Sequence, residues 1–190
     1  EFSFSIGPTG SGKTTPMRLM YFDLLPDAGR VKVNGFSSKS MTNRKIPKAR
    51  KSIGMVFQDY KLLDDRNLFE NVALPLHVLG YSAREIPERV EEALELVGLE
   101  GKDHNFPNEL SGGEQQRACL ARAIIKEPDI VLADEPTGNL DHDSAEQVFN
   151  LLVELVKKTG VAALIATHNP ELAGKMDRVL RLENGILVPD

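Results

Sequence analysis

The sequence of 190 residues has a single cysteine and no tryptophan. Because Cys119 has no second cysteine to pair with, the chain cannot be a disulfide-stapled scaffold. Its 28 acidic and 23 basic residues are interleaved, and the net charge of −5 does not favour nucleic acid as a partner. No apolar stretch approaches the ~20 residues of a membrane-spanning helix, and no signal peptide is recognisable. A hydrophobic fraction of 41% is that of a globular protein with a sizeable core.

Strand patterns occur near both ends of the chain. Phe2, Phe4 and Ile6 alternate with serines, and because the chain opens within this strand we expect its natural N-terminus to lie upstream. Residues 130–133 and 161–166 are apolar throughout, as parallel strands buried on both faces should be. Shorter strands are predicted at 31–35 with an Asn34-Gly35 turn, at 53–58, and in a hairpin over 178–188.

The middle of the chain has helical spacing instead. Ile86, Val90 and Leu94 fall on one helical face, and Gly98 follows as a helix terminator. A further helix, which Gly160 ends, separates the two buried strands. The pattern therefore predicts an α/β fold with a P-loop NTPase core, an inserted helical subdomain and a small antiparallel β region. We expect one domain over 1–190, with the core and small β region in 1–58 and 128–190 and the helical subdomain in 59–127.

A phosphate-binding loop follows the first strand. Residues 7–14 read GPTGSGKT and match the pattern G-x-x-x-x-G-K-[ST] (Walker A) before an expected helix. In such a loop backbone N–H groups face the anion, Lys13 reaches the β- and γ-phosphates, and the Thr14 hydroxyl binds Mg²⁺. Pro16 comes so early that the helix must start late or have a distorted first turn. The residues predicted to hold the nucleotide here are Gly7, Pro8, Thr9, Gly10, Ser11, Gly12, Lys13, Thr14 and Thr15.

Two acids end the buried strand at 130–133. Successive strand residues point to opposite sides, so Asp134 and Glu135 are aimed differently. Asp134 suits a magnesium shell, and Glu135 suits polarisation of an attacking water. Paired acids after an apolar strand also commonly mark only its exit to solvent. Together with the phosphate loop, they favour ATP or GTP hydrolysis.

Four further short motifs follow a fixed order. Gln58 lies in VFQD, LSGGE spans 110–114, GNLD spans 138–141, and His168 ends ATH. In this order, with the phosphate loop and the acidic strand end, they make the chain resemble the ATP-binding subunits of ATP-binding cassette (ABC) transporters over nearly its whole length. Each motif alone is unspecific, but six in sequence are very specific.

The resemblance implies a composite ATPase site that two copies of the chain form around two ATP molecules. A serine and two glycines at a helix start make an anion cradle. By resemblance, the cradle of Ser111, Gly112, Gly113 and Glu114 contacts the γ-phosphate held by the second subunit, and Asp141 also contacts nucleotide. The resemblance makes Glu135, His168 and Gln58 catalytic, and makes Thr14, Gln58 and Asp134 the Mg²⁺ ligands. Glu114 stands where glutamine is commonest, and the family's adenine-stacking aromatic belongs to a region upstream of residue 1.

Within the family, LLDDRNLFENVALPL and LADEPTGNLD most resemble the cell-division ATP-binding subunits, and next the lipoprotein-release and macrolide-efflux ATPases. This resemblance implies a peripheral protein on the cytoplasmic face of the plasma membrane, with an integral permease-like partner. A DNA-repair or chromosome-condensation ATPase would need a longer insert, and a small-molecule kinase would not use LSGGE. Tyr60 and Asp65 follow Gln58, which is the glutamine of the segment called the Q-loop in this family. They are the candidate contacts to the membrane partner.

Overall fold

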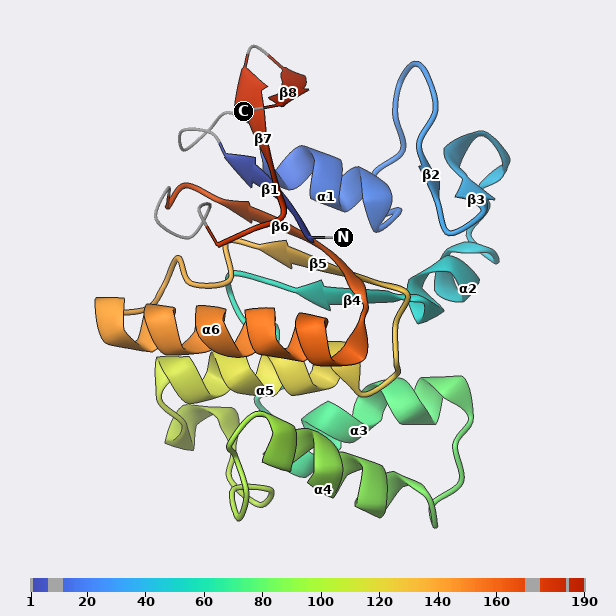
Figure 1. Ribbon diagram of the computed structural model, residues 1–190. Helices are drawn as coiled ribbons and strands as arrows, with labels where there is room; N and C mark the ends of the chain where they lie inside the picture. Colours follow the sequence, from blue (N-terminus) through green and yellow to red (C-terminus); the bar gives the residue numbers. More distant parts are fainter. Residues whose placement is uncertain (1, 7–11, 170–174, 184, 190) are drawn as a thin grey trace.

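A six-stranded sheet forms the centre of the protein, in the order β4-β5-β6-β1-β7-β8 (Figure 1). The computed structural model describes residues 2–6, 12–169, 175–183 and 185–189. The paired strands are parallel except for β8, which runs antiparallel to β7. The strands of this sheet are β1 (Phe2–Ile6), β4 (Ile53–Val56), β5 (Ile130–Asp134), β6 (Ala162–Thr167), β7 (Arg178–Glu183) and β8 (Ile186–Pro189).

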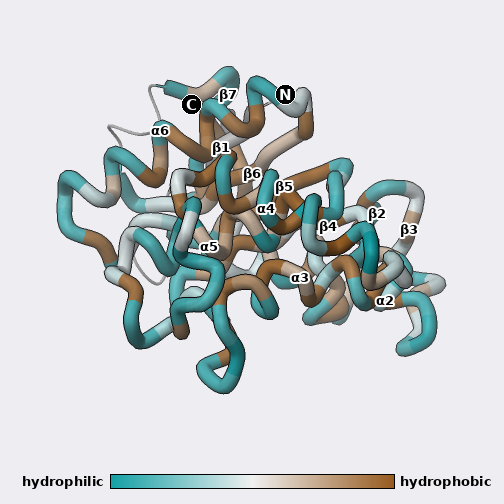
Figure 2. The backbone as a smooth tube through the Cα atoms, turned by 90° about the horizontal axis from the view of Figure 1, so that it is seen from below, coloured by the Kyte–Doolittle hydropathy of each residue, from teal (hydrophilic) through white to brown (hydrophobic). Residues whose placement is uncertain are grey.

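Two apolar clusters cover opposite faces of the sheet, as the uninterrupted apolar strands predict. Val131 and Ala133 belong to the cluster shared with α3 (Leu68–Leu79), α4 (Ile86–Leu96), α5 (Gly112–Ile124) and α6 (His142–Thr159). Leu132, between them, belongs to the cluster shared with α1 (Thr14–Met20) and α2 (Ile46–Lys51). Alternate residues of one strand therefore serve both layers. Figure 2 shows the central strands largely in hydrophobic colours and the outer loops mostly in hydrophilic ones.

The helical segment is built on capped helices. Asn67 starts α3 with a reciprocal capping box to Glu70, and Ser111 starts α5 with the same arrangement to Glu114. Gly160 ends α6 in the left-handed conformation, as the sequence predicts. In Figure 1, α5 and α6 lie side by side under the sheet, with α3 and α4 beyond them. A short 3-10 helix, η2 (Pro107–Glu109), precedes α5.

The predicted Asn34-Gly35 turn is present, and it closes the hairpin of β2 (Lys32–Val33) and β3 (Phe36–Ser37). Both turn residues have positive φ, 46° and 79°, as a two-residue hairpin turn of this type requires. The 3-10 helix η1 (Ser38–Ser40) and α2 follow. The mixed α/β architecture, with its small antiparallel region, is the one that the sequence predicts.

Two local expectations need correction. The strand predicted over 53–58 ends at Val56, so that Phe57 and Gln58 leave the sheet. Helix α1 begins at Thr14 with Pro16 as its third residue. A first-turn N–H has no partner within the helix in any case, so proline fits there without a late start. Among the helices that the structure describes, none is both long and apolar enough for a membrane span.

Candidate active site

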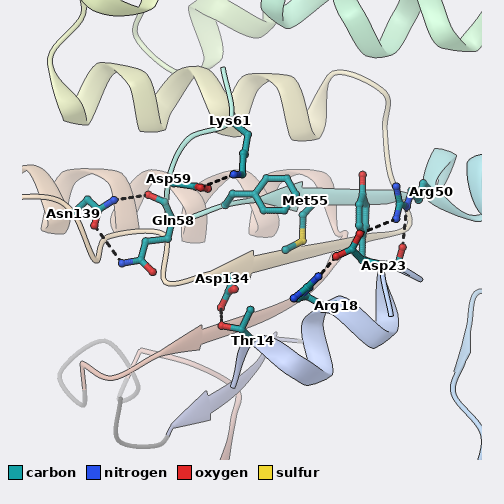
Figure 3. Close-up of a pocket in the computed structure, with 12 residues that line it drawn as sticks. Thr14, Arg18, Asp23, Arg50, Met55, Gln58, Asp59, Lys61, Asp134 and Asn139 are labelled. Carbon is teal, nitrogen blue, oxygen red and sulfur yellow. Dashed lines mark hydrogen bonds and ion pairs between the residues drawn. The ribbon is translucent and has the colours of Figure 1, made fainter. Parts of the chain in front are cut away.

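The end of β5 meets the start of α1. Thr14 donates a hydrogen bond from its hydroxyl to Oδ1 of Asp134, at 3.2 Å (Figure 3). Lys13 and Asp134 are buried, with 6% and 8% of their surface exposed, whereas Thr14 and Thr15 are exposed. Gly12, directly before them, has a φ of 94°, which glycine adopts readily. The other residues predicted for the phosphate loop, Gly7, Pro8, Thr9, Gly10 and Ser11, lie outside the described residues.

Burial raises the pKa of Asp134 above its ordinary value. The hydrogen bond from Thr14 opposes this shift, and the neighbouring charge of Glu135 adds to it. A cation beside the carboxylate would favour its ionised form. Hydroxyl and carboxylate oxygens side by side are also the hard donors that Mg²⁺ prefers, usually completed by phosphate and water. The Thr14–Asp134 pair therefore fits a magnesium ion that arrives with its nucleotide, and no cluster of three or more His, Cys, Asp or Glu suited to a metal occurs among the described residues.

Glu135 follows the last residue of β5, and its carboxylate has a different partner on each oxygen. Oε1 lies 3.4 Å from Nζ of Lys13. Oε2 lies 2.9 Å from Nδ1 of His168 and accepts the backbone N–H of His168 at 3.3 Å. The backbone of Glu135 is in the left-handed region, with φ 46°, and its N–H donates to the carbonyl of Ala166 at 2.8 Å. Three predicted site residues thus meet at one carboxylate.

Gln58 binds the GNLD segment through its side-chain amide and through its backbone carbonyl. Its side chain donates to Oδ1 of Asn139 at 3.2 Å, and the Asn139 side chain donates back to the Gln58 carbonyl at 2.9 Å. Gln58 lines a pocket of about 870 Å³ together with Thr14 and Asp134 (Figure 3). The structure thus brings the three predicted magnesium-binding residues to one pocket.

The LSGGE segment lies elsewhere, at the start of α5. The Ser111 hydroxyl accepts the N–H of Glu114 at 3.3 Å, and the Glu114 carboxylate accepts the N–H of Ser111 at 2.8 Å. Lys102 also binds that carboxylate. The bond from Lys102, followed by that from the Ser111 backbone, lowers the pKa of Glu114 to about 2. Ser111 is exposed and is not among the residues that line the pocket beside Thr14, so this segment is free to meet another chain.

Gly112 of LSGGE has close neighbours, which gives it a packing role that the sequence did not indicate, whereas Gly113 has room for an ordinary contact. A Cβ on Gly112 would lie 3.0 Å from the Tyr60 hydroxyl and 3.3 Å from Leu140, and one on Gly113 would lie 3.4 Å from Ser144. Asp141, predicted to contact nucleotide, is exposed and caps α6 by accepting the Ser144 N–H at 3.0 Å. The helices α5 and α6 therefore begin side by side (Figure 1), and Leu140 of the GNLD segment lies near Gly112 in the first turn of α5.

The chain belongs to the ABC transporter family, whose model matches residues 3–138. It is an ATPase of the ABC type, and ATP is its nucleotide. Its relatives include two cell-division ATP-binding proteins FtsE that align with the whole chain and 83% of their own length: that of Streptococcus pneumoniae at 46% identity and that of Bacillus subtilis at 44%. The lipoprotein-releasing system protein LolD of a Ruegeria species is 46% identical over 96% of this chain and 81% of its own.

Solved structures agree with this assignment. The dimeric ATP-binding cassette MJ0796, described as a post-hydrolysis state bound to ADP and phosphate, superposes with a TM-score of 0.89 at 34% identity, covering all of this chain and 84% of that one. The protein cbiO1 of Clostridium perfringens, part of the transporter complex cbiONQ, superposes with a TM-score of 0.88 at 29% identity, over 99% and 75% of the two chains.

Proposed function

We propose that this chain forms a homodimer around two MgATP molecules and drives a conformational change in a membrane partner, in a cell-division role like that of FtsE. The observation that carries the proposal is the carboxylate of Glu135, which is held between Lys13 and His168 next to the Thr14–Asp134 pair. In this proposal Glu135 is the base, Lys13 the cation that binds phosphate, and Thr14 and Asp134 the metal-binding oxygens. Such a constellation suits hydrolysis of a terminal phosphate.

Each residue has a distinct role in the proposed reaction. Thr14, Asp134 and Gln58 would hold a magnesium ion, which supplies charge neutralisation on the β- and γ-phosphates. Lys13 would contact the same phosphates, and Glu135 would accept a proton from the attacking water. His168 would keep the carboxylate of Glu135 oriented through its 2.9 Å contact. The cradle from Ser111 to Glu114, in which Ser111 is exposed, would together with Asp141 complete the site of a second copy.

The proposed membrane partner is an integral, permease-like protein of the FtsX type, which would hold this chain at the cytoplasmic face of the plasma membrane. The pocket beside Gln58 has charged walls from Arg18, Asp59 and Lys61 and an apolar part from Met55, so it suits an amphipathic helix. Asp65 is exposed on the segment that follows. Asp65 is the candidate contact to the membrane partner that lies outside the pocket.

A lipoprotein-release role is the second candidate, because LolD proteins reach the same identity as FtsE proteins. The segment LLDDRNLFENV favours the cell-division role by resemblance. The two roles differ in the membrane protein that the ATPase binds, and this can be measured directly.

The test is co-purification in detergent with an FtsX-type and a LolD-system membrane protein from the same organism, together with ATP turnover in each complex. We expect binding and altered turnover with the FtsX-type protein. Asp65→Lys should weaken that complex and leave basal turnover within a few-fold of normal, whereas Glu88→Lys, the same charge reversal on α4, should leave the complex intact. Selective binding to the lipoprotein-release partner would refute the cell-division role, and an intact Asp65→Lys complex would place the contact elsewhere.

A further inference from the structure

Two residues directly after the Q-loop glutamine have an unusual backbone. Tyr60 and Lys61 both have positive φ, 57° and 54°. Side chains other than glycine rarely adopt this left-handed conformation, and two in succession are costly unless the surroundings hold them. The conformation turns the chain sharply between Gln58 in the pocket and the start of α3. Some group outside the segment must therefore stabilise it.

That group is Arg122, in the last turn of α5. Its guanidinium donates from Nη2 to the Tyr60 carbonyl at 2.7 Å and from Nη1 to the Lys61 carbonyl at 2.6 Å. The rigid, planar fork of arginine matches two oxygens that lie close together, and a charged donor makes both bonds strong. Arg122 therefore binds the backbone of the bend directly and holds both of the left-handed residues at once.

Cys119, one turn earlier on α5, adds a third bond to the same site. Its thiol donates to the Tyr60 carbonyl at 2.9 Å. Burial raises the pKa of this thiol to about 12, so the group is a protonated donor at neutral pH. The Tyr60 carbonyl thus accepts from two side chains of one helix, and both of its lone-pair directions are used.

The side chain of Tyr60 returns to the beginning of the same helix. Its hydroxyl lies 3.0 Å from the position that a Cβ would take on Gly112, the first glycine of LSGGE. Tyr60 therefore contacts α5 at its first turn through the ring and at its last turns through the carbonyl. The half-buried ring of Tyr60 also packs against the core cluster of the helical segment. Its contact with a membrane partner stays a prediction.

We propose that Arg122 is a positioning residue of the ATPase. It fixes the bend at Tyr60 and Lys61. The fixed bend keeps Gln58 in the pocket of Thr14 and Asp134 and keeps Tyr60 against the LSGGE segment. The inference rests on the proposed role of Gln58. Upstream of the bend, the paired bonds between Gln58 and Asn139 tie the same segment to the GNLD segment. Loss of the guanidinium would loosen the bend, which would keep only the Cys119 bond, and Gln58 would be positioned through Asn139 alone while the phosphate-binding residues stay in place.

The experiment compares Arg122→Gln, Arg122→Lys and Gln58→Ala with the wild-type chain in steady-state ATP hydrolysis. Arg89→Gln is the matched control, since Arg89 pairs with Glu127 and stacks over Tyr81, and among the described residues its hydrogen bonds and ion pairs do not involve residues 58–61. We expect Arg122→Gln to lower kcat about tenfold or more with KM for ATP within about threefold of normal, the pattern of a lost transition-state contribution. Arg122→Lys, which reaches one carbonyl, should fall between Arg122→Gln and the wild type. Arg89→Gln should keep its kcat.

Hydrogen exchange of a peptide covering residues 57–63 gives a readout independent of turnover. It should be faster in both Arg122 variants and unchanged in Arg89→Gln, even if Arg122→Gln is too unstable for kinetics. Normal kcat in Arg122→Gln while Gln58→Ala is impaired would overturn the positioning role alone. Normal kcat in Gln58→Ala would overturn the proposed role of Gln58. Equal losses in Arg122→Gln and Arg89→Gln would reduce Arg122 to general stability and overturn the inference.

Discussion

Two adjacent carboxylates, Asp134 and Glu135, differ because the strand ends between them. Asp134 is the last residue of β5 and keeps the strand's alternation, which turns it toward α1 and Thr14. Glu135 is already left-handed and bonds to β6 through the Ala166 carbonyl. Its side chain therefore meets Lys13 and His168. One residue of displacement along the chain separates the proposed metal-binding carboxylate from the proposed base.

The role of Glu135 as the base is tested with Glu135→Gln. The amide keeps the size of the side chain and cannot accept the proton, so hydrolysis should slow by ~10² or more, the usual range for loss of a general base. MgATP binding should stay near normal, and an ATP-bound dimer should accumulate. Single-turnover kinetics and equilibrium nucleotide binding measure the two effects separately. Undiminished hydrolysis would remove Glu135 from the reaction.

At the scale of elements, the sheet lies very close to helix α5 at Gly54 of β4. A Cβ there would lie 2.9 Å from the Ala123 carbonyl of α5 and 3.2 Å from Pro128. The bulky residue on either side, Ile53 or Met55, faces the opposite layer. A glycine at this position thus lets α5 lie against the strand that leads to Gln58. The distance between α5 and the segment that begins at Gln58 therefore depends on Gly54.

We expect Gly54→Ala to destabilise the protein by about 1–3 kcal/mol, the usual cost of overpacking a core. The comparison is Gly113→Ala, where the new Cβ would make an ordinary contact at 3.4 Å with Ser144. Alanine is the better helix former, so Gly113→Ala should stay within about 1 kcal/mol of wild type. Urea unfolding followed by far-UV circular dichroism measures both. Equal stability of the two variants would contradict the close approach at Gly54.

At the scale of the whole molecule, the site divides into two surfaces. The residues around Thr14, Gln58 and Asp134 share one pocket, while Ser111 is exposed at the start of a different helix. Under the proposed function, the signature of one copy completes the phosphate loop of the other. A two-fold axis would then give two equivalent sites. Complementation between mutant chains separates this arrangement from one in which each chain works alone.

A mixed dimer with Ser111→Arg on one chain and Lys13→Ala on the other should hydrolyse ATP, because one composite site keeps an intact phosphate loop and an intact signature. Placing both changes on one chain beside a wild-type partner should abolish turnover, because each composite site then carries one change. Ser111→Arg alone should leave ATP binding to the monomer largely intact. The reverse pattern in the two mixed dimers would show that signature and phosphate loop act within one chain.

The sequence by itself determined the elements and the family. The Asn34-Gly35 turn, the apolar runs of β5 and β6, and the glycine that ends α6 depend on local backbone preferences and periodicity, which neighbouring residues suffice to encode. The ordered motifs identified the ABC family, which the comparisons confirm. The roles of the individual site residues stay predictions, and residues 59–127 stay a proposed subdomain.

Only the tertiary structure decided which side chains meet. Gln58 and Asn139 are 81 residues apart and bond reciprocally, and Arg122 reaches back 62 residues to the carbonyl of Tyr60. No periodicity encodes such pairs, because they arise when the parallel strand order brings distant loops to the same edge of the sheet. The left-handed backbone of Tyr60 and Lys61 is equally hidden, since neither residue type favours it. Contacts from α5 hold that bend, and α5 lies more than fifty residues further along the chain.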